Sequence, residues 1–155
     1  GAMDTDRQWS PAAFAEVILA MRKAFPGITS VLVGAPSEQP VMEAIQGRLP
    51  PESVVLSTML SFDAAIDLLR RSLLFVGNDS SLLNIAAACD RPAIGLFAQS
   101  KPLDYNPNIK AVSVPDGRYG VPGGIASITP DQVFNAITAE LRQIDDVAFR
   151  EMQKT

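Results

Sequence analysis

The residues best suited to chemistry in this chain are the run Asp79, Ser80 and Ser81, which separates an apolar segment from an alanine-rich one. With Gly77 and Asn78 before it, the run forms a cluster of residue types preferred in turns and at helix N-caps, so these five residues predict a turn that opens a helix. The first turn of a helix carries N–H groups without intrahelical partners, and these attract phosphate. Asp79 would repel phosphate, but its carboxylate can accept hydrogen bonds from sugar hydroxyls. A simple cap and turn without a ligand is the alternative.

The elements on either side place this run at one edge of a sheet. Residues 72–76 predict a short buried strand, residues 82–89 a short helix, and residues 93–98 a second buried strand. A helix that joins two parallel strands makes a right-handed crossover. The polar run then follows a strand and precedes a helix, which is where open α/β sheets bind their ligands.

The other patterns predict the same alternation of helices and strands. A helix begins at Ser10 and Pro11, Ser61 can cap the helix that follows it, and a capping box at residues 129–132 opens the last helix. The remaining helices are expected at residues 41–48 and 62–71, the latter with Phe62, Ile66 and Leu69 inward, and the remaining strands at 30–33, 54–56 and 110–114. The sequence therefore predicts a three-layer α/β/α, Rossmann-like sandwich on a mostly parallel sheet of about five strands.

The length of 155 residues suits one compact domain with its own core and is too short for two ordinary ones. We expect residues 1–3 to be a scar left by tag removal. Residues 4–144 would form the domain. Residues 145–155 would form a polar tail that frays or docks elsewhere.

Composition excludes several classes of function. The net charge of −4 argues against a nucleic-acid partner, and no apolar run approaches the ~20 residues that span a bilayer. One cysteine excludes an internal disulfide and suits a reducing cytosol. The absence of histidine removes Ser-His-Asp and Cys-His triads, and together with the single cysteine it leaves no zinc site to expect. Neither the dinucleotide fingerprint nor the P-loop occurs.

Four segments carry a family resemblance. Residues 76–88, VGNDSSLLNIAAA, look like the signature D-[ST]-G-x-x-H-x-A-A-A, and residues 91–102, RPAIGLFAQSKP, are similar to P-x-[IV]-x-L-[FY]-G-x-T-x-P. Residues 34–38, GAPSE, resemble a G-x-P-x-E loop, and residues 7–14 resemble an R-x-W-[PS]-x-x-x-[FW] start. These motifs, in this order, are those of glycosyltransferase family 9, the bacterial heptosyltransferases.

The resemblance implies the carboxyl-terminal half of an enzyme with two Rossmann-like halves, the GT-B arrangement. In that family this half binds a nucleotide-sugar donor, usually ADP-heptose, which is a substrate and not a cofactor. The amino-terminal half binds the lipopolysaccharide acceptor, a glycan or lipid-linked molecule, and carries the catalytic base. We therefore expect this fragment to bind nucleotide without turnover. The expected location is the cytoplasm, either free or at the inner face of the bacterial inner membrane.

The residues that the resemblance assigns to donor binding form two groups. One group lines the nucleoside side, with Glu38 as a candidate for the ribose hydroxyls, and the other faces the diphosphate and the sugar. The first group is Gly34, Pro36 and Glu38, and the second is Asp79, Ser80, Ser81, Asn84 and Ser100. No metal site and no catalytic residue is assigned within the chain.

Three positions depart from the family pattern. Ser81 and Ala98 stand where the motifs have glycine, and Asn84 stands where they have histidine. Serine adds a side chain where the backbone should approach phosphate, and asparagine carries no positive charge. Two interpretations therefore remain open. The chain is either a transferase half, for ADP-heptose or another donor, or a degenerate, non-catalytic domain that binds or scaffolds within a larger protein.

Overall fold

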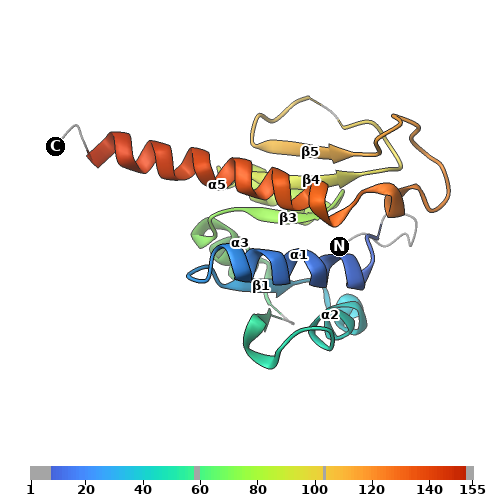
Figure 1. Ribbon diagram of the computed structural model, residues 1–155, viewed down its shortest axis with the longest axis horizontal. Helices are drawn as coiled ribbons and strands as arrows, with labels where there is room; N and C mark the ends of the chain where they lie inside the picture. Colours follow the sequence, from blue (N-terminus) through green and yellow to red (C-terminus); the bar gives the residue numbers. More distant parts are fainter. Residues whose placement is uncertain (1–7, 58–59, 103, 153–155) are drawn as a thin grey trace.

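The computed structural model describes residues 8–57, 60–102 and 104–152, so the expected tag scar lies outside the described residues. Within these ranges, helices and strands alternate along the chain (Figure 1). Their bounds are α1 (Pro11–Ala24), β1 (Ser30–Val33), α2 (Gln39–Gln46), β2 (Val54–Ser57), α3 (Phe62–Arg71), β3 (Phe75–Asn78), α4 (Ser81–Ala88), β4 (Ala93–Phe97), β5 (Ile109–Ser113) and α5 (Pro130–Met152).

Local hydrogen bonds explain where three of the helices begin. The hydroxyls of Ser10 and Ser61 each accept a hydrogen bond from the backbone N–H three residues later, which caps α1 and α3. At α5 the Gln132 N–H donates to the Thr129 hydroxyl, and the Thr129 N–H donates to the Gln132 side chain. All three predicted helix starts are confirmed.

All strand pairs of the described residues are parallel, as predicted, but they form two ladders and not one. One ladder joins β1 to β2, and the other runs β3-β4-β5. The strands β1, β3, β4 and β5 lie in that order in Figure 1, so β1 is the neighbour of β3 without pairing with it. A large apolar pocket, described below, is lined by both strands. A single sheet would instead have backbone hydrogen bonds between β1 and β3.

Helices cover both faces of the strands, which gives the expected three layers. On one face α5 packs against β4, β5 and α1; on the other, α4 packs against β3 and β4 and also contacts α3. Alternate side chains of β4 serve the two faces. Ile94 and Leu96 join the cluster with α1 and α5, while Ala93 and Phe97 join the cluster with α3 and α4. The Rossmann-like α/β fold class is thus confirmed.

Several element boundaries differ from the predictions by one or two residues, and two differ by more. The strand expected at residues 72–76 begins at Phe75 and runs to Asn78, because the parallel ladder pairs Phe75 through Asn78 with β4. Gly77 and Asn78, expected in a turn, therefore belong to the strand. Helix α5 continues to Met152 and so includes most of the segment expected as a tail.

The orientation predicted for Phe62 is wrong. Its side chain is 67% exposed, whereas Leu69 on the same helix is 2% exposed. Leu69 lies in the last turn of α3 and packs in the cluster that α4 shares with β3 and β4. Phe62 is the first residue of α3, at the opposite end of the helix from Leu69, and its side chain lies in solvent.

Trp9 fixes the start of the described chain next to the end of β3. Its indole is 2% exposed, and its Nε1–H donates to the carbonyl of Ile128 at 2.9 Å. The Trp9 backbone N–H donates to Asn78 Oδ1 at 3.0 Å. Because Asn78 immediately precedes Asp79, these bonds fix the backbone at the edge where the predicted site residues lie.

Candidate functional site

The first turn of α4 lacks a side-chain cap. Ser80 occupies the N-cap position in an extended conformation, and its side chain makes no capping hydrogen bond. The Ser80 Oγ is buried and has no hydrogen-bond partner among the described residues. Ser81 is exposed. Neither serine therefore satisfies the N–H groups of this turn, in contrast to the capping serines of α1 and α3.

Asp79 and Asn84 lie on either side of this turn. The Asp79 N–H donates to the Leu96 carbonyl at 3.3 Å, which extends the contact with β4 one residue beyond β3. Asn84 donates from Nδ2 to the Ser80 carbonyl at 3.1 Å, and its Oδ1 accepts a hydrogen bond from the Tyr105 hydroxyl. The amide of Asn84 thus connects the start of α4 to the segment between β4 and β5.

Three of the predicted residues meet in one small pocket. Asp79, Asn84 and Ser100 line a cavity of about 90 Å³, together with Phe97 and Ile109. The pocket combines a carboxylate, an amide and a hydroxyl, which are the groups that bind sugar hydroxyls. This volume is well below the ~300 Å³ of an ordinary small-molecule site, so the pocket has room for only one part of a larger ligand.

Lys101 and Tyr105 also line this pocket, and the sequence interpretation did not include them. Lys101 stands inside the motif at residues 91–102, directly after Ser100, so its position was a usable signal. Tyr105 offered none, because a single aromatic residue in a polar loop matches no motif. Only the contact with Asn84 shows that it belongs to the site.

The nucleoside-side group lies apart from the small pocket, on the loop after β1. Glu38 Oε2 accepts a hydrogen bond from the Ala35 N–H at 2.8 Å, and Pro36 opens the short 3₁₀ turn between them. A side chain on Gly34 would place its Cβ 3.0 Å from that same oxygen. The loop conformation therefore depends on a glycine at residue 34 and on the carboxylate of Glu38.

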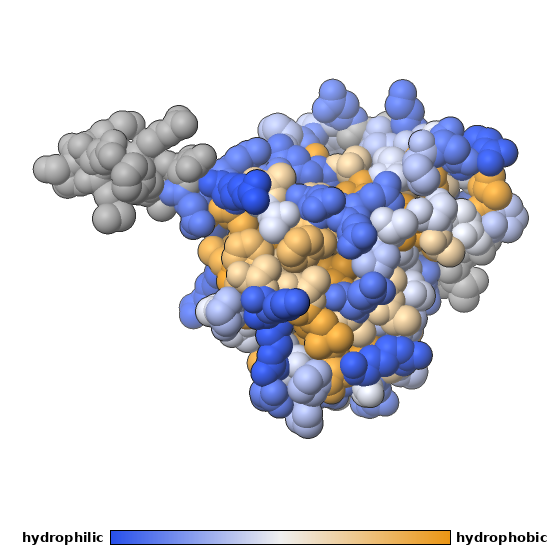
Figure 2. All heavy atoms as spheres, viewed as in Figure 1, coloured by the Kyte–Doolittle hydropathy of each residue, from blue (hydrophilic) through white to orange (hydrophobic). Residues whose placement is uncertain are grey.

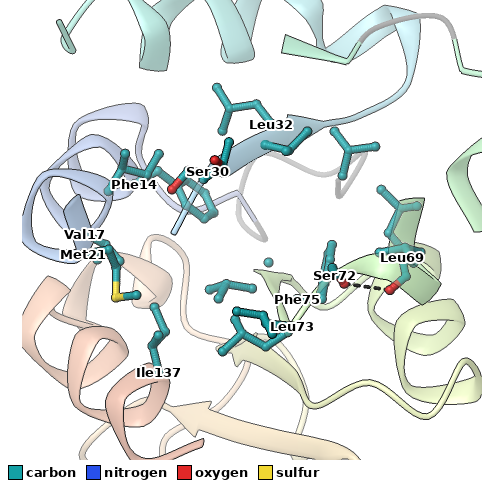
Figure 3. A pocket seen from close by; sticks show the side chains of 18 of the residues that line it. Phe14, Val17, Met21, Ser30, Leu32, Leu69, Ser72, Leu73, Phe75 and Ile137 are labelled. Carbon is teal, nitrogen blue, oxygen red and sulfur yellow. Dashed lines mark hydrogen bonds between the residues drawn. The ribbon is translucent and has the colours of Figure 1, made fainter. Parts of the chain in front are cut away.

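A second, larger pocket of about 500 Å³ separates β1 from β3 (Figure 3). Most of its lining is apolar and includes Phe14 and Met21 from α1, Leu32 from β1, Leu73 from the segment before β3, and Ile137 from α5. Apolar residues also gather on the face where α1 and α5 lie (Figure 2). No sequence pattern indicated this pocket.

The larger pocket reaches the predicted site through a few polar residues. Its lining includes Glu38 from the loop after β1, and Asn78 and Ser80 from the end of β3 and the start of α4. The predicted residues therefore flank the start of α4 in two groups. Asp79, Asn84 and Ser100 lie together on the small pocket, while Glu38 and Ser80 border the large one.

The described residues contain neither a helix suited to crossing a bilayer nor a cluster of metal-ligating side chains. No helix in this part of the chain combines the length and the apolar character needed to cross a bilayer. The same residues bring no three His, Cys, Asp or Glu side chains together as a metal site would require.

Known proteins resemble this chain in sequence and in structure. Lipooligosaccharide heptosyltransferase 2 of Haemophilus influenzae is 36% identical over 85 residues, which make up 52% of this chain and 24% of that protein. The structure of E. coli ADP-heptose lps heptosyltransferase II superposes with a TM-score of 0.82 at 24% identity, covering 94% of this chain and 45% of that one.

A further solved structure, E. coli heptosyltransferase WaaC with ADP-2-deoxy-2-fluoro heptose, has a TM-score of 0.74 at 23% identity. It covers 90% of this chain and 41% of that one. This chain therefore spans less than half the length of each of these three relatives. The family model described as "Glycosyltransferase family 9 (heptosyltransferase)" matches residues 1–117, more than half of the chain. The chain belongs to glycosyltransferase family 9.

Proposed function

We propose that this chain is the donor-binding half of a family 9 glycosyltransferase and holds a nucleoside diphosphate sugar at the start of α4. The observation that carries the proposal is the N-cap of α4, where the buried Ser80 hydroxyl makes no capping hydrogen bond and has no partner among the described residues. A diphosphate placed there would accept hydrogen bonds from this hydroxyl and from the first-turn N–H groups. The helix dipole would add further attraction.

The sugar would occupy the small pocket beside the diphosphate. Asp79 would accept hydrogen bonds from its hydroxyls, and Asn84 and Ser100 supply further polar groups. Two solved structures of E. coli heptosyltransferase WaaC contain a nucleotide, ADP in one and ADP-2-deoxy-2-fluoro heptose in the other. ADP-heptose is accordingly the first donor to test.

The nucleoside would lie against the loop after β1. The Glu38 carboxylate already holds this loop by accepting the Ala35 N–H. We therefore assign Glu38 first to shaping the loop, and its contact with ribose hydroxyls would follow from its position at the rim of the large pocket. Gly34 and Pro36 contribute the backbone shape of the same wall.

In this proposal the chain stabilises the departing diphosphate without a metal ion. Backbone N–H groups at the start of α4 face the phosphate oxygens, where negative charge grows as the glycosidic bond breaks. The base that activates the acceptor hydroxyl belongs to a preceding half, which would also bind the glycan or lipid-linked acceptor. The isolated chain would then bind the donor without transferring the sugar.

A second function, a non-catalytic binding or scaffold domain, is favoured by one contact. The Asn84 amide is engaged within the chain by Ser80 and Tyr105, at the position where the family motif has histidine. An amide held in this way supplies no positive charge to a diphosphate. A domain that keeps the fold but has lost the donor would show this arrangement.

Thermal unfolding with nucleotides separates the two functions. The ligands are ADP, GDP and UDP and the corresponding nucleotide sugars. At a concentration of about 100 times its dissociation constant, the ligand that binds should stabilise the chain by about 2.7 kcal/mol and raise Tm by roughly 5–10 °C. Ser80→Ala should reduce this shift. Ser61→Ala, which removes the cap of α3, should lower Tm without changing the shift.

If none of these nucleotides or nucleotide sugars raises Tm, the donor site is contradicted and the scaffold function is favoured. Sugar transfer by the isolated chain would contradict the assignment of the base to another half.

A further inference from the structure

Lys101 places a positive charge in the small pocket. The formally charged residues of its lining are Asp79 and Lys101. We propose that Lys101 binds the sugar-linked phosphate of the donor and makes the site select nucleoside diphosphates over monophosphates. This inference rests on the proposed function and adds a residue that the family motifs leave undefined, since Lys101 occupies a variable position of the segment 91–102.

The charged groups around the pocket indicate what the Lys101 ammonium would contribute there. The start of α4 contributes only about half a positive charge, and the Asp79 carboxylate beside it carries a full negative one. Asn84, at the motif's histidine position, adds no charge. The diphosphate would lie at the start of α4, at the edge of this pocket, where an ammonium group on the pocket wall would add attraction for the sugar-linked phosphate. The ammonium of Lys101 is a compact charge with three donors, which suits a phosphate group.

Two hydrogen bonds hold the segment that carries Lys101 against α4. The Tyr105 hydroxyl donates to Asn84 Oδ1 in the first turn, and Asn108 Nδ2 donates to the Ala87 carbonyl at 3.1 Å near the other end of the helix. These bonds place Tyr105 and Asn108 against α4, and Lys101 lines the same small pocket as Asp79 and Asn84 at the start of that helix. The Lys101 side chain itself is exposed and can adjust to a ligand.

The test compares a diphosphate with a monophosphate. Binding of ADP and AMP is measured by calorimetry for the unaltered chain and for K101M, K101R and K110M. K101M removes the charge while keeping the apolar stem, and K101R retains the charge. Lys110, exposed on β5 and outside the small-pocket lining, provides the matched control. GDP with GMP and UDP with UMP replace the adenine pair if either diphosphate binds more tightly.

We expect K101M to weaken diphosphate binding about tenfold and monophosphate binding by less than about twofold. K101R should stay near the unaltered chain, and K110M should change neither affinity. Raising NaCl from low to physiological concentration should reduce the difference in diphosphate affinity between the unaltered chain and K101M, because salt screens the charge of an ammonium group at the surface.

Three results would overturn the role of Lys101 while leaving the donor site intact. They are an unchanged diphosphate affinity in K101M, an equal loss for diphosphate and monophosphate, and a K101R variant as weak as K101M. Failure of the unaltered chain to bind any of these nucleotides would overturn the proposed function itself, and the inference with it.

Discussion

Gly34 controls the shape of the loop that would line the nucleoside. A Cβ at this residue would lie 3.0 Å from Glu38 Oε2 and 3.3 Å from Met42 Sδ, both closer than ordinary van der Waals contact. The glycine thus lets the Glu38 carboxylate reach the Ala35 N–H. One absent side chain therefore determines whether the loop keeps its conformation.

Gly34→Ala should displace Glu38 and weaken its bond to Ala35, lowering the free energy of unfolding by about 1–2 kcal/mol through overpacking. Urea unfolding measures the loss. Gly27→Ala is the matched control, because a Cβ there has no neighbour within 4 Å and the change should be neutral or slightly stabilising. Equal stability of the two variants would show that Glu38 does not occupy this place.

Among the elements, α4 is the one whose position determines the site. It packs on β3 and β4, and at Gly95 the helix and the strand approach closely. A Cβ on Gly95 would lie 2.5 Å from Leu83 Cδ2 and 2.6 Å from Phe97 Cε2. Because Leu83 belongs to α4, a larger residue at 95 would push the first turn of the helix away from the strand.

Gly95→Ala should cost about 1–3 kcal/mol of stability and weaken nucleotide binding at the start of α4. Denaturant unfolding and a nucleotide titration measure the two effects. Gly124→Ala serves as control, because its Cβ would meet Val121 and Val114 at ordinary contact distances of 3.7 and 4.0 Å. A fully stable Gly95→Ala variant would contradict the close packing of α4 on β4.

At the scale of the whole molecule, α1 connects the two ladders. Val17 and Met21 pack in the cluster with β4, β5 and α5, while Ala15 and Ile18 pack in a separate cluster with α2 and β2. Between these clusters lies the 500 Å³ pocket, where apolar side chains lack neighbours on one side. We therefore expect a side chain that fills part of this pocket to gain contacts and to stabilise the domain.

Ser30→Val tests this view. Ser30 lies on β1 and lines the pocket, so an added branched apolar side chain should fill part of it and suit the strand (Figure 3). Stability should rise by about 0.5–1 kcal/mol, and calorimetry should show a higher Tm. Ser30→Thr has nearly the same shape but keeps the hydroxyl, so it should gain less. A destabilised Ser30→Val variant would argue that the pocket has no room at β1.

The sequence by itself determined the elements that depend on local physics, together with the family. Ser30–Val33 and Phe62–Arg71 have the predicted bounds, and the caps at Ser10, Ser61 and Thr129 form as expected. A cap acts between residues three apart, and an apolar stripe repeats within one helix, so both leave a readable pattern. Asp79, Asn84 and Ser100, which the motifs single out, line one pocket, while their roles in donor binding remain predictions.

Only the tertiary structure decided the rest. The register of β3, the missing ladder between β1 and β3, and the meeting of Lys101 and Tyr105 with Asn84 all join residues distant in sequence. Such contacts depend on how the helices pack and on which polar groups then find partners, and neither leaves a periodic or local signal in the chain.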